Sequence, residues 1–200
     1  MKTQDKTEKK PAKQVPLYSF SIELKNVFPK IWRHFFVPSN IPLTRFHAVI
    51  QKVMGWSDEH VYSFAIRGEK YLYMHKYDHF RLSDDQFYVE PSQTKLSAFG
   101  LRKGYNIEYI YDLGDCWVHA LKTLDTNYVP QTPGLKRGCI AGARACPPED
   151  CGGPYGYMYL LDILADPNHP EYEDRLEWLE EPLAPEAFDI ETINRKLRRL

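Results

Sequence analysis

Three cysteines, several glycines and a pair of acidic residues crowd one short stretch of this chain. The stretch reads CIAGARACPPEDCGGPYGY and contains Cys139, Cys146 and Cys151 with the spacing C-x6-C-x4-C. Thiolates are good zinc ligands, and a loop rich in glycine and proline needs a constraint that orders it. His119 is the best candidate for a fourth ligand, with Cys116 behind it. Zinc is therefore the cofactor that this stretch predicts, and thiols that are buried or partly exposed to solvent, without a metal, are the alternative.

A second group of chemically able residues lies upstream, in the string YDLGDCWVH. On a strand, Asp115, Trp117 and His119 face the same side, so an acid, an indole and an imidazole would form one wall of a binding pocket. An imidazole near carboxylates such as Asp112 suits a general base or a metal ligand. The simpler interpretation is a hairpin turn followed by a core tryptophan and a hydrogen-bonded histidine, since no nucleophile accompanies them.

The cysteine-rich stretch also carries Arg144, Glu149 and Asp150, which would join this site if the loop folds back on the sheet. Arg144 then either binds an anion or pairs with Asp115, and the sequence leaves both open. A helix that starts over residues 154–157 would present free N–H groups to an anion, and Gly152 and Gly153 would permit its close approach, although no phosphate-loop consensus accompanies it. No catalytic residue is assigned, and the predicted binding residues are Asp112, Asp115, Trp117, His119, Arg144, Glu149, Asp150 and Tyr157.

The elements that would position these groups begin with strands. Alternation of apolar residues predicts strands over residues 18–24, 30–37, 61–66, 105–111 and 116–124. Two antiparallel hairpins are expected, one from the first two strands and one from the last two. Apolar residues at intervals of three and four predict a helix over 42–54, capped by Ser39 or Asn40 and ended by Gly55. Residues 69–82 are expected to form a hairpin or a loop, and residues 96–101 a short helix.

Beyond residue 128 prolines become frequent and the alternation stops, so helices are predicted over 155–165, 172–179 and 190–200. The predicted fold class is α+β. It combines a mixed, mostly antiparallel sheet and a packed helix in the N-terminal two-thirds with a helical C-terminal third. Residues 1–16 are rich in lysine and poor in apolar side chains, which predicts a basic disordered arm ahead of a single domain over 17–200.

Composition and charge limit the class of protein. Hydrophobic residues make up 43% of the 200 residues and charged residues 26%, which excludes a disordered, collagen-like or coiled-coil chain as a whole. No apolar run is long enough for a membrane span or a signal peptide, so we expect a soluble cytoplasmic protein without a membrane partner. The net charge of −1 gives no global positive field for nucleic acid.

Two features of the surface leave partners open. Aromatic residues such as Trp32 and Trp56 would stack bases if they were exposed beside Arg33 or Arg67, although most aromatic side chains belong to cores. Residues 171–191 are strongly acidic, whereas residues 195–199 are basic. A homodimer is therefore an alternative to a protein or nucleic-acid partner, because these segments offer complementary surfaces.

Long strings of the sequence resemble the plasmid pRiA4b ORF-3-like family: YDLGDCWVH, the cysteine-rich stretch, LLDILADPNHPEYEDRLEWL and FDIETINRKL. The string YSFSIELKNVFPKIWRHFFVP fits as well, so the resemblance covers about residues 17–199. It implies an α+β fold found on plasmids and in insertion elements as a passenger protein, with no activity to carry over. Some members carry a resolvase label, but Ser19 and Ser21 lie on an alternating strand without the arginines of a serine recombinase. Nor does the sequence contain the arginine, histidine and tyrosine set of a tyrosine recombinase.

The family pattern carries over to particular positions of this chain. Cys116 falls where the family is expected to vary, which argues against it as an essential ligand. The matching residues are Asp112, Gly114, Asp115, Trp117, His119, Cys139, Gly142, Arg144, Cys146, Pro147, Pro148, Glu149, Asp150, Cys151, Gly152, Gly153, Gly156 and Tyr157.

These observations favour an uncharacterised binding domain associated with plasmids and mobile elements. It would recognise protein or nucleic acid through the face formed by Asp115, Trp117 and His119 and through the cysteine-rich loop. The alternative is a metal-dependent hydrolase or nuclease that uses His119, Asp112 or Asp115 together with the thiols.

Overall fold

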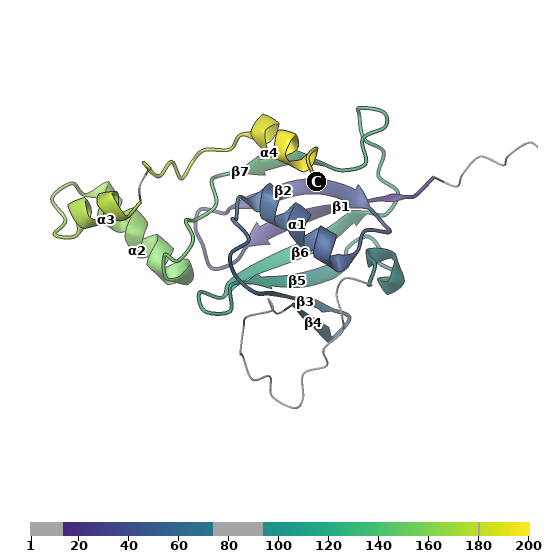
Figure 1. Ribbon diagram of the computed structural model, residues 1–200, viewed down its shortest axis with the longest axis horizontal. Coiled ribbons are helices and arrows are strands. Elements are labelled where there is room, and N and C mark those ends of the chain that lie inside the picture. Colours follow the sequence, from purple (N-terminus) through teal and green to yellow (C-terminus); the bar gives the residue numbers. More distant parts are fainter. Residues whose placement is uncertain (1–13, 74–93, 180) are drawn as a thin grey trace, which may run out of the picture.

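The computed structural model describes residues 14–73, 94–179 and 181–200, and this part of the chain contains one antiparallel sheet of seven strands with helices beside it (Figure 1). In the sheet the strands follow the order β4-β3-β5-β6-β1-β2-β7, so the predicted α+β class is confirmed. The strands are β1 (Leu17–Leu24), β2 (Trp32–Pro38), β3 (Tyr62–Ile66), β4 (Glu69–Tyr73), β5 (Asn106–Tyr111), β6 (Trp117–Asp125) and β7 (Gly138–Ala143).

The strands predicted from alternation form, with ends that differ by one or two residues. β1 pairs with β2 and β5 pairs with β6, both antiparallel, as expected for two hairpins. β4 completes a hairpin with β3, and the rest of the predicted hairpin or loop, residues 74–82, lies outside the described residues. A 3₁₀ helix forms over Leu96–Phe99, close to the predicted short helix.

Helix α1 (Leu43–Met54) packs across one face of the sheet and closes the core (Figure 1). Phe46 lies within 5.3 Å of Phe20, 6.1 Å of Phe35 and 5.6 Å of Phe64, measured between ring centroids. This contact follows from the apolar positions at intervals of three and four that the sequence places on one side of the helix. The helix ends at Gly55 as predicted, where a φ of 124° suits a residue without a side chain.

The start of α1 differs from the prediction. Pro42 occupies the N-cap position and no side chain accepts a hydrogen bond from the first turn, so neither Ser39 nor Asn40 caps the helix. Pro42 has an extended backbone and no N–H of its own, and the N–H of the next residue, Leu43, donates to the Thr94 carbonyl oxygen at 2.8 Å.

The prediction that strands stop after residue 128 is wrong, because β7 forms the edge of the sheet beside β2. Its sequence, GCIAGA, has no alternation of large apolar residues, so periodicity did not reveal it. Gly142 also has a packing reason for its small size. A Cβ at this position would approach the Arg33 Cδ and a Phe188 ring carbon to 2.6 Å each.

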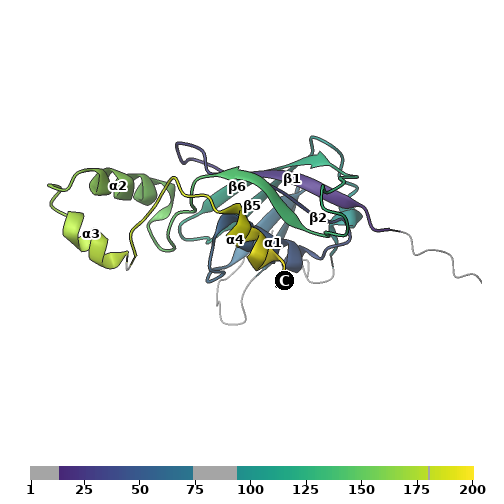
Figure 2. The ribbon, with the colours of Figure 1, turned by 90° about the horizontal axis from the view of Figure 1, so that it is seen from above.

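The remaining helices follow β7. Helices α2 (Gly153–Ala165) and α3 (Tyr172–Trp178) contact each other and lie beyond one end of the sheet (Figure 2). Helix α4 (Ile190–Leu197) returns to pack against α1 and β7, and the Asp189 side chain caps it by accepting from the Thr192 N–H at 2.9 Å. None of the helices in the described residues has the length and apolar character needed to cross a membrane.

A buried arginine on β2 joins three of these elements. The Arg33 guanidinium donates to the carbonyl oxygens of Val53 and Met54, the last residues of α1. It also donates to the carbonyl oxygens of Ala143 and Arg144, at 2.7 and 2.6 Å, where β7 ends, and to that of its neighbour Trp32. Since helix-end carbonyls have no partner within the helix, this one side chain replaces the missing donors.

We predict that Arg33→Met lowers the free energy of unfolding by about 3 kcal/mol or more, because it leaves several buried carbonyls without donors. Arg33→Lys should recover only part of the loss, since one ammonium group cannot reach five carbonyl oxygens. Urea unfolding measures both effects. Arg45→Met on the exposed side of α1 is the control and should change stability by less than about 0.5 kcal/mol; equal effects at the two positions would contradict the prediction.

Candidate functional site

Three loops that are far apart in the sequence meet at one end of the sheet. His60 lies two residues before the start of β3, and Asp112 directly follows β5. These strands are antiparallel neighbours with Tyr62 opposite Tyr111, so the start of one and the end of the other lie side by side. Glu149 and Asp150 come from the loop between β7 and α2, which folds back onto this end of the sheet.

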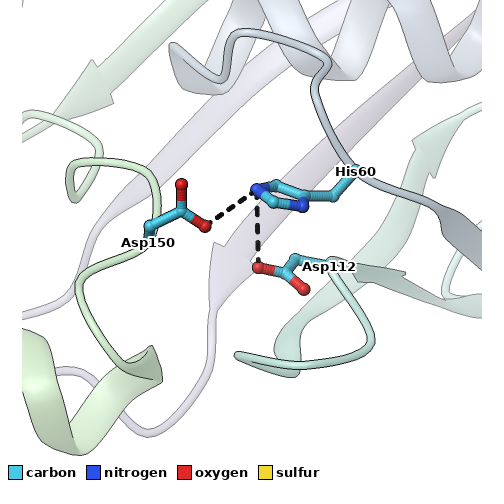
Figure 3. Close-up of side chains that lie close together, drawn as sticks. All are labelled: His60, Asp112 and Asp150. Carbon is cyan, nitrogen blue, oxygen red and sulfur yellow. Dashed lines mark ion pairs between the residues drawn. The ribbon is translucent and has the colours of Figure 1, made fainter.

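The ring of His60 lies at the centre of this group, between carboxylates (Figure 3). Its Nε2 is 3.2 Å from an oxygen of Asp150, 3.8 Å from one of Asp112 and 3.8 Å from one of Glu149. One ligand atom each from His60, Asp112 and Asp150 fall within 4.8 Å of one another. Within the described residues, these three side chains are the ones whose potential ligand atoms come close enough together to hold a metal ion.

Hydrogen bonds hold two of the carboxylates in place through the oxygen that does not face His60. Asp112 Oδ1 accepts from the backbone N–H groups of Gly114 and Asp115, at 2.8 and 3.3 Å. Glu149 Oε1 accepts from the Ser57 N–H at 2.7 Å and the Tyr111 hydroxyl at 3.0 Å. One oxygen of each carboxylate is thus fixed by the fold, and the second oxygen faces His60. We name His60, Asp112, Glu149 and Asp150 the acid–histidine cluster.

Burial raises the pKa of two groups at this cluster, the Glu149 carboxyl and the Tyr111 hydroxyl. The half-buried position of Glu149 raises the pKa of its carboxyl, although the hydrogen bonds from Ser57 and Tyr111 act against the rise. Burial and the adjacent Glu149 carboxylate raise the pKa of Tyr111, while a backbone hydrogen bond from Glu59 opposes this. The Tyr111 hydroxyl therefore keeps its proton at neutral pH and donates a hydrogen bond to Glu149.

The loop that carries Glu149 and Asp150 is docked against the turn that follows β5. Asp115 Oδ2 accepts from the Gly152 N–H at 3.1 Å. Gly153, with a φ of 70°, lies so close that a Cβ there would approach the Asp115 carbonyl oxygen to 2.5 Å. The two glycines allow the loop and the turn to touch, which brings acidic residues of both segments to His60.

A small cavity of about 240 Å³ opens beside His60, and a hydrogen-bonded chain forms part of its wall. Asp58 accepts from His47 Nε2 at 2.6 Å, and His47 Nδ1 is 2.8 Å from the Tyr109 hydroxyl. The Tyr109 hydroxyl accepts a further hydrogen bond from the Gln51 side-chain amide, besides its contact with His47. Both ring nitrogens of His47 are thus engaged. The residues that line the cavity are Thr44, His47, Ala48, Asp58, Glu59, His60, Val61 and Tyr62.

The predicted site residues separate into two groups in the structure. Asp112, Glu149 and Asp150 come together, because the loop folds back onto this end of the sheet. Trp117 and His119 are fully buried beneath the loop after α1, so they belong to the core and do not form the wall of an open pocket. His119 Nε2 accepts from the Trp56 indole N–H at 3.2 Å, which is the simpler of the two interpretations of that string.

The arginine and the tyrosine of the predicted site have structural partners. Arg144 forms an ion pair with Glu186 at 2.6 Å, and no ion pair with Asp115 is found within the described residues. Tyr157 is fully buried in the core. Arg33, considered above as a base-stacking partner, is also buried, as is Trp56.

The thiols and His119 do not converge on one point in the described residues. Cys139 lies on β7, and its Sγ donates to the Ala141 carbonyl oxygen at 3.6 Å. Cys146 packs against Gly55, whose added Cβ would come within 3.1 Å of it. Burial raises the pKa of Cys139 to about 11 and that of Cys151 to about 12. Cys139 is buried, whereas Cys146 and Cys151 are partly exposed.

Sequence reasoning missed His60 and Tyr111 as members of the site. The signal for His60 was a histidine that follows two acidic residues, Asp58 and Glu59, just ahead of a strand. Such a pattern occurs on many surfaces, and only the pairing of β3 with β5 brings it to Asp112. Tyr111 alternates as a core residue should, and its hydroxyl reaches the site from the end of the strand.

Comparison with known proteins agrees with this description of the fold. A family model described as plasmid pRiA4b ORF-3-like protein matches residues 16–195, so the chain belongs to that family. It is 34% identical over 161 residues to "Uncharacterized protein y4hQ" of Sinorhizobium fredii (strain NBRC 101917 / NGR234), covering 78% of this chain and 77% of the relative. A crystal structure of a protein of unknown function, MM3350 from Methanosarcina mazei Go1, is similar with a TM-score of 0.74 and 32% identity. That match covers 88% of this chain and 96% of the other.

The buried His119 should make stability depend on pH. Burial lowers its pKa from the ordinary 6.5 to about 4 in the folded protein. As the pH falls from 6.5 toward 4, the unfolded chain therefore binds a proton that the folded protein does not, and the free energy of unfolding decreases. We expect a loss of up to roughly 1.4 kcal/mol per pH unit from this residue. Urea unfolding of the wild type and His119→Gln should diverge in slope only within this window; parallel pH profiles would refute the prediction.

The tight docking of the loop before α2 predicts the effect of an alanine at Gly156. A Cβ there would collide with the Cys151 carbonyl oxygen. Although alanine normally favours a helix over glycine by about 1 kcal/mol, Gly156→Ala should destabilise the protein by about 1–3 kcal/mol. Tyr155→Ala, one residue earlier and 89% exposed, is the matched control and should be nearly neutral. Stabilisation by Gly156→Ala in chemical unfolding would show that the docking is loose.

Proposed function

We propose that this member of the family is a binding domain that holds a divalent cation with the acid–histidine cluster. His60, Asp112 and Asp150 would be the ligands, and Glu149 would add a further negative charge beside them. The observation that carries the proposal is the approach of one imidazole nitrogen and two carboxylate oxygens, from three separate loops, to within 4.8 Å of one another. Imidazole and carboxylate groups together suit ions such as Mn²⁺ and Zn²⁺.

Some of the ligand atoms lie only slightly farther apart than they would around a shared cation. Nitrogen and oxygen ligands lie about 2.0–2.2 Å from such an ion, which puts them roughly 3–3.5 Å from each other. His60 Nε2 lies 3.2 and 3.8 Å from its two carboxylate neighbours. This nitrogen and Glu149 Oε2 are also buried without a hydrogen-bond partner. A bound ion, with the water that it carries, would satisfy both atoms.

The cation would also join segments that the backbone does not link. It would connect the loop before β3, the turn after β5 and the loop before α2. Such a cross-link favours the folded state by the free energy of binding, as any ligand of the folded protein does. The cation would then hold the loop that carries Glu149 and Asp150 in one arrangement against the sheet. In that arrangement the loop would bind a protein or nucleic-acid partner.

A metal-dependent hydrolase or nuclease is the second candidate, in a form different from the one predicted from sequence. Of the residues first considered for it, Asp112 belongs to the cluster, whereas His119 and the thiols do not. Three protein ligands would leave positions on the ion for water, and the cavity beside His60 would admit a small substrate group. This candidate therefore shares the cation site and differs in requiring turnover.

Calorimetric titration with Mn²⁺, Zn²⁺ and Mg²⁺ tests the proposal. We expect one ion per chain, and at least about tenfold weaker binding in both His60→Gln and Asp112→Asn. The asparagine keeps an oxygen that can accept from Gly114, so the turn should remain folded. Glu59→Gln is the matched control, because it removes a negative charge next to the cluster without removing a ligand, and it should bind within about threefold of the wild type.

Two results would overturn the cation site: no binding of any of the three ions, or binding that is equally strong in Asp112→Asn. Hydrolysis of a phosphodiester by the Mn²⁺-loaded protein, lost in Asp112→Asn and kept in Glu59→Gln, would establish the hydrolase. Binding without turnover would favour the binding domain.

A further inference from the structure

Helices α2 and α3 form a projection that the sheet does not cover. We name residues 153–179 the arm; it lies beyond one end of the sheet in both views of the molecule (Figures 1 and 2). Helix α3 contains no buried residue. The arm exposes large apolar side chains, namely Tyr155, Tyr159, Leu176 and Trp178. Exposed tryptophan and tyrosine beside apolar residues are typical of protein interfaces.

The exposed apolar residues of α3 are surrounded by acidic side chains. Glu173, Asp174 and Glu177 are exposed and take part in no ion pair with another described residue. The one basic residue of the helix, Arg175, is engaged by Glu171 at 2.8 Å. The outer surface of α3 is therefore acidic around Leu176 and Trp178.

Helix α4 carries the opposite charge. Leu197 is buried and anchors the helix to the rest of the domain. Four basic residues at the end of the chain are exposed, and within the described part of the chain none of them lies in an ion pair: Arg195, Lys196, Arg198 and Arg199. Basic groups here also suit the dipole of α4, so their position alone does not require a partner.

The two charged helices cannot meet within one chain in this structure. Helix α3 lies at the far end of the arm, whereas α4 lies over α1 and β7 (Figures 1 and 2). A second copy of the chain can bring its α4 to the first copy's α3, and by symmetry the reverse contact forms at the same time. Two equal contacts would then bring acidic and basic side chains together at each.

We propose that two copies of this chain form a symmetric dimer in which α3 of each copy docks on α4 of the other. On α3 the exposed acidic side chains lie between Leu176 and Trp178, which are two residues apart and point to opposite sides, so the charges form the centre of each contact and the two apolar side chains its edges. This inference is independent of the cation site, because none of its residues belongs to the acid–histidine cluster.

Charge reversal gives a test with an internal rescue. The acidic-helix variant combines Glu173→Lys with Glu177→Lys, and the basic-helix variant combines Arg195→Glu with Arg198→Glu. Sedimentation equilibrium of the wild type should give a dimer that weakens as salt rises from about 50 to 500 mM. Each variant alone should dissociate at least about tenfold more readily, because both of its contacts then bring like charges together.

An equimolar mixture of the two variants should restore the dimer to within about threefold of the wild-type affinity. In the mixed dimer one contact has wild-type charges on both helices and the other has both charges reversed, so both contacts are attractive. The control variant, Arg102→Glu with Lys122→Glu, changes two exposed charges elsewhere and should leave the dimer unchanged. Trp178→Ala should also weaken the dimer, at every salt concentration.

Three results would overturn the proposal: a wild-type monomer at about 100 μM in low salt, a dimer that both charge-reversed variants form as well as the wild type, or a mixture that remains monomeric. Circular dichroism of each variant separates loss of the contact from loss of the fold. Restoration of the dimer in the mixture also shows that each variant is folded, since a misfolded chain would not be rescued.

Discussion

The hydrogen bonds of the buried Arg33 guanidinium are the constraint on which the rest of this structure depends. This guanidinium reaches from β2 to the last carbonyls of α1 and to the end of β7. The loop that leads to His60 begins directly after the first of these points, and the loop that carries Glu149 and Asp150 begins directly after the second. Its burial lowers the pKa of Arg33, yet five carbonyl oxygens compensate the charge through hydrogen bonds. The starting points of both loops are thereby fixed by one side chain.

The acid–histidine cluster illustrates how a fold can hold like charges together. Hydrogen bonds from Gly114 and from Ser57 keep Asp112 and Glu149 in place, each through one oxygen. The second oxygens then face a single imidazole, an arrangement that leaves excess negative charge in a partly buried place. The proposed divalent cation would supply the positive charge that this group lacks.

The loop between β7 and α2 connects the cluster to the arm. Glu149 and Asp150 are followed within a few residues by the first turn of α2, whose glycines pack against Asp115 and Cys151. Whatever holds the loop against the sheet therefore also sets where α2 begins. Similarity to the solved structure from Methanosarcina mazei, a protein of unknown function, extends over most of both chains and agrees with the fold as a whole.

The sequence by itself determined the elements whose signal is local. Alternation and the three-to-four spacing located five strands and α1, and long strings identified the family, because neighbouring residues alone decide these patterns. The tertiary structure alone decided which residues meet. It placed His60 beside Asp112 through the pairing of β3 with β5, and formed β7 from glycine and alanine beside Arg33. It also buried Trp117 and His119, which the sequence had placed on a pocket wall. The physical reason is that strand pairing and burial join residues far apart in the chain, and local spacing carries no information about that.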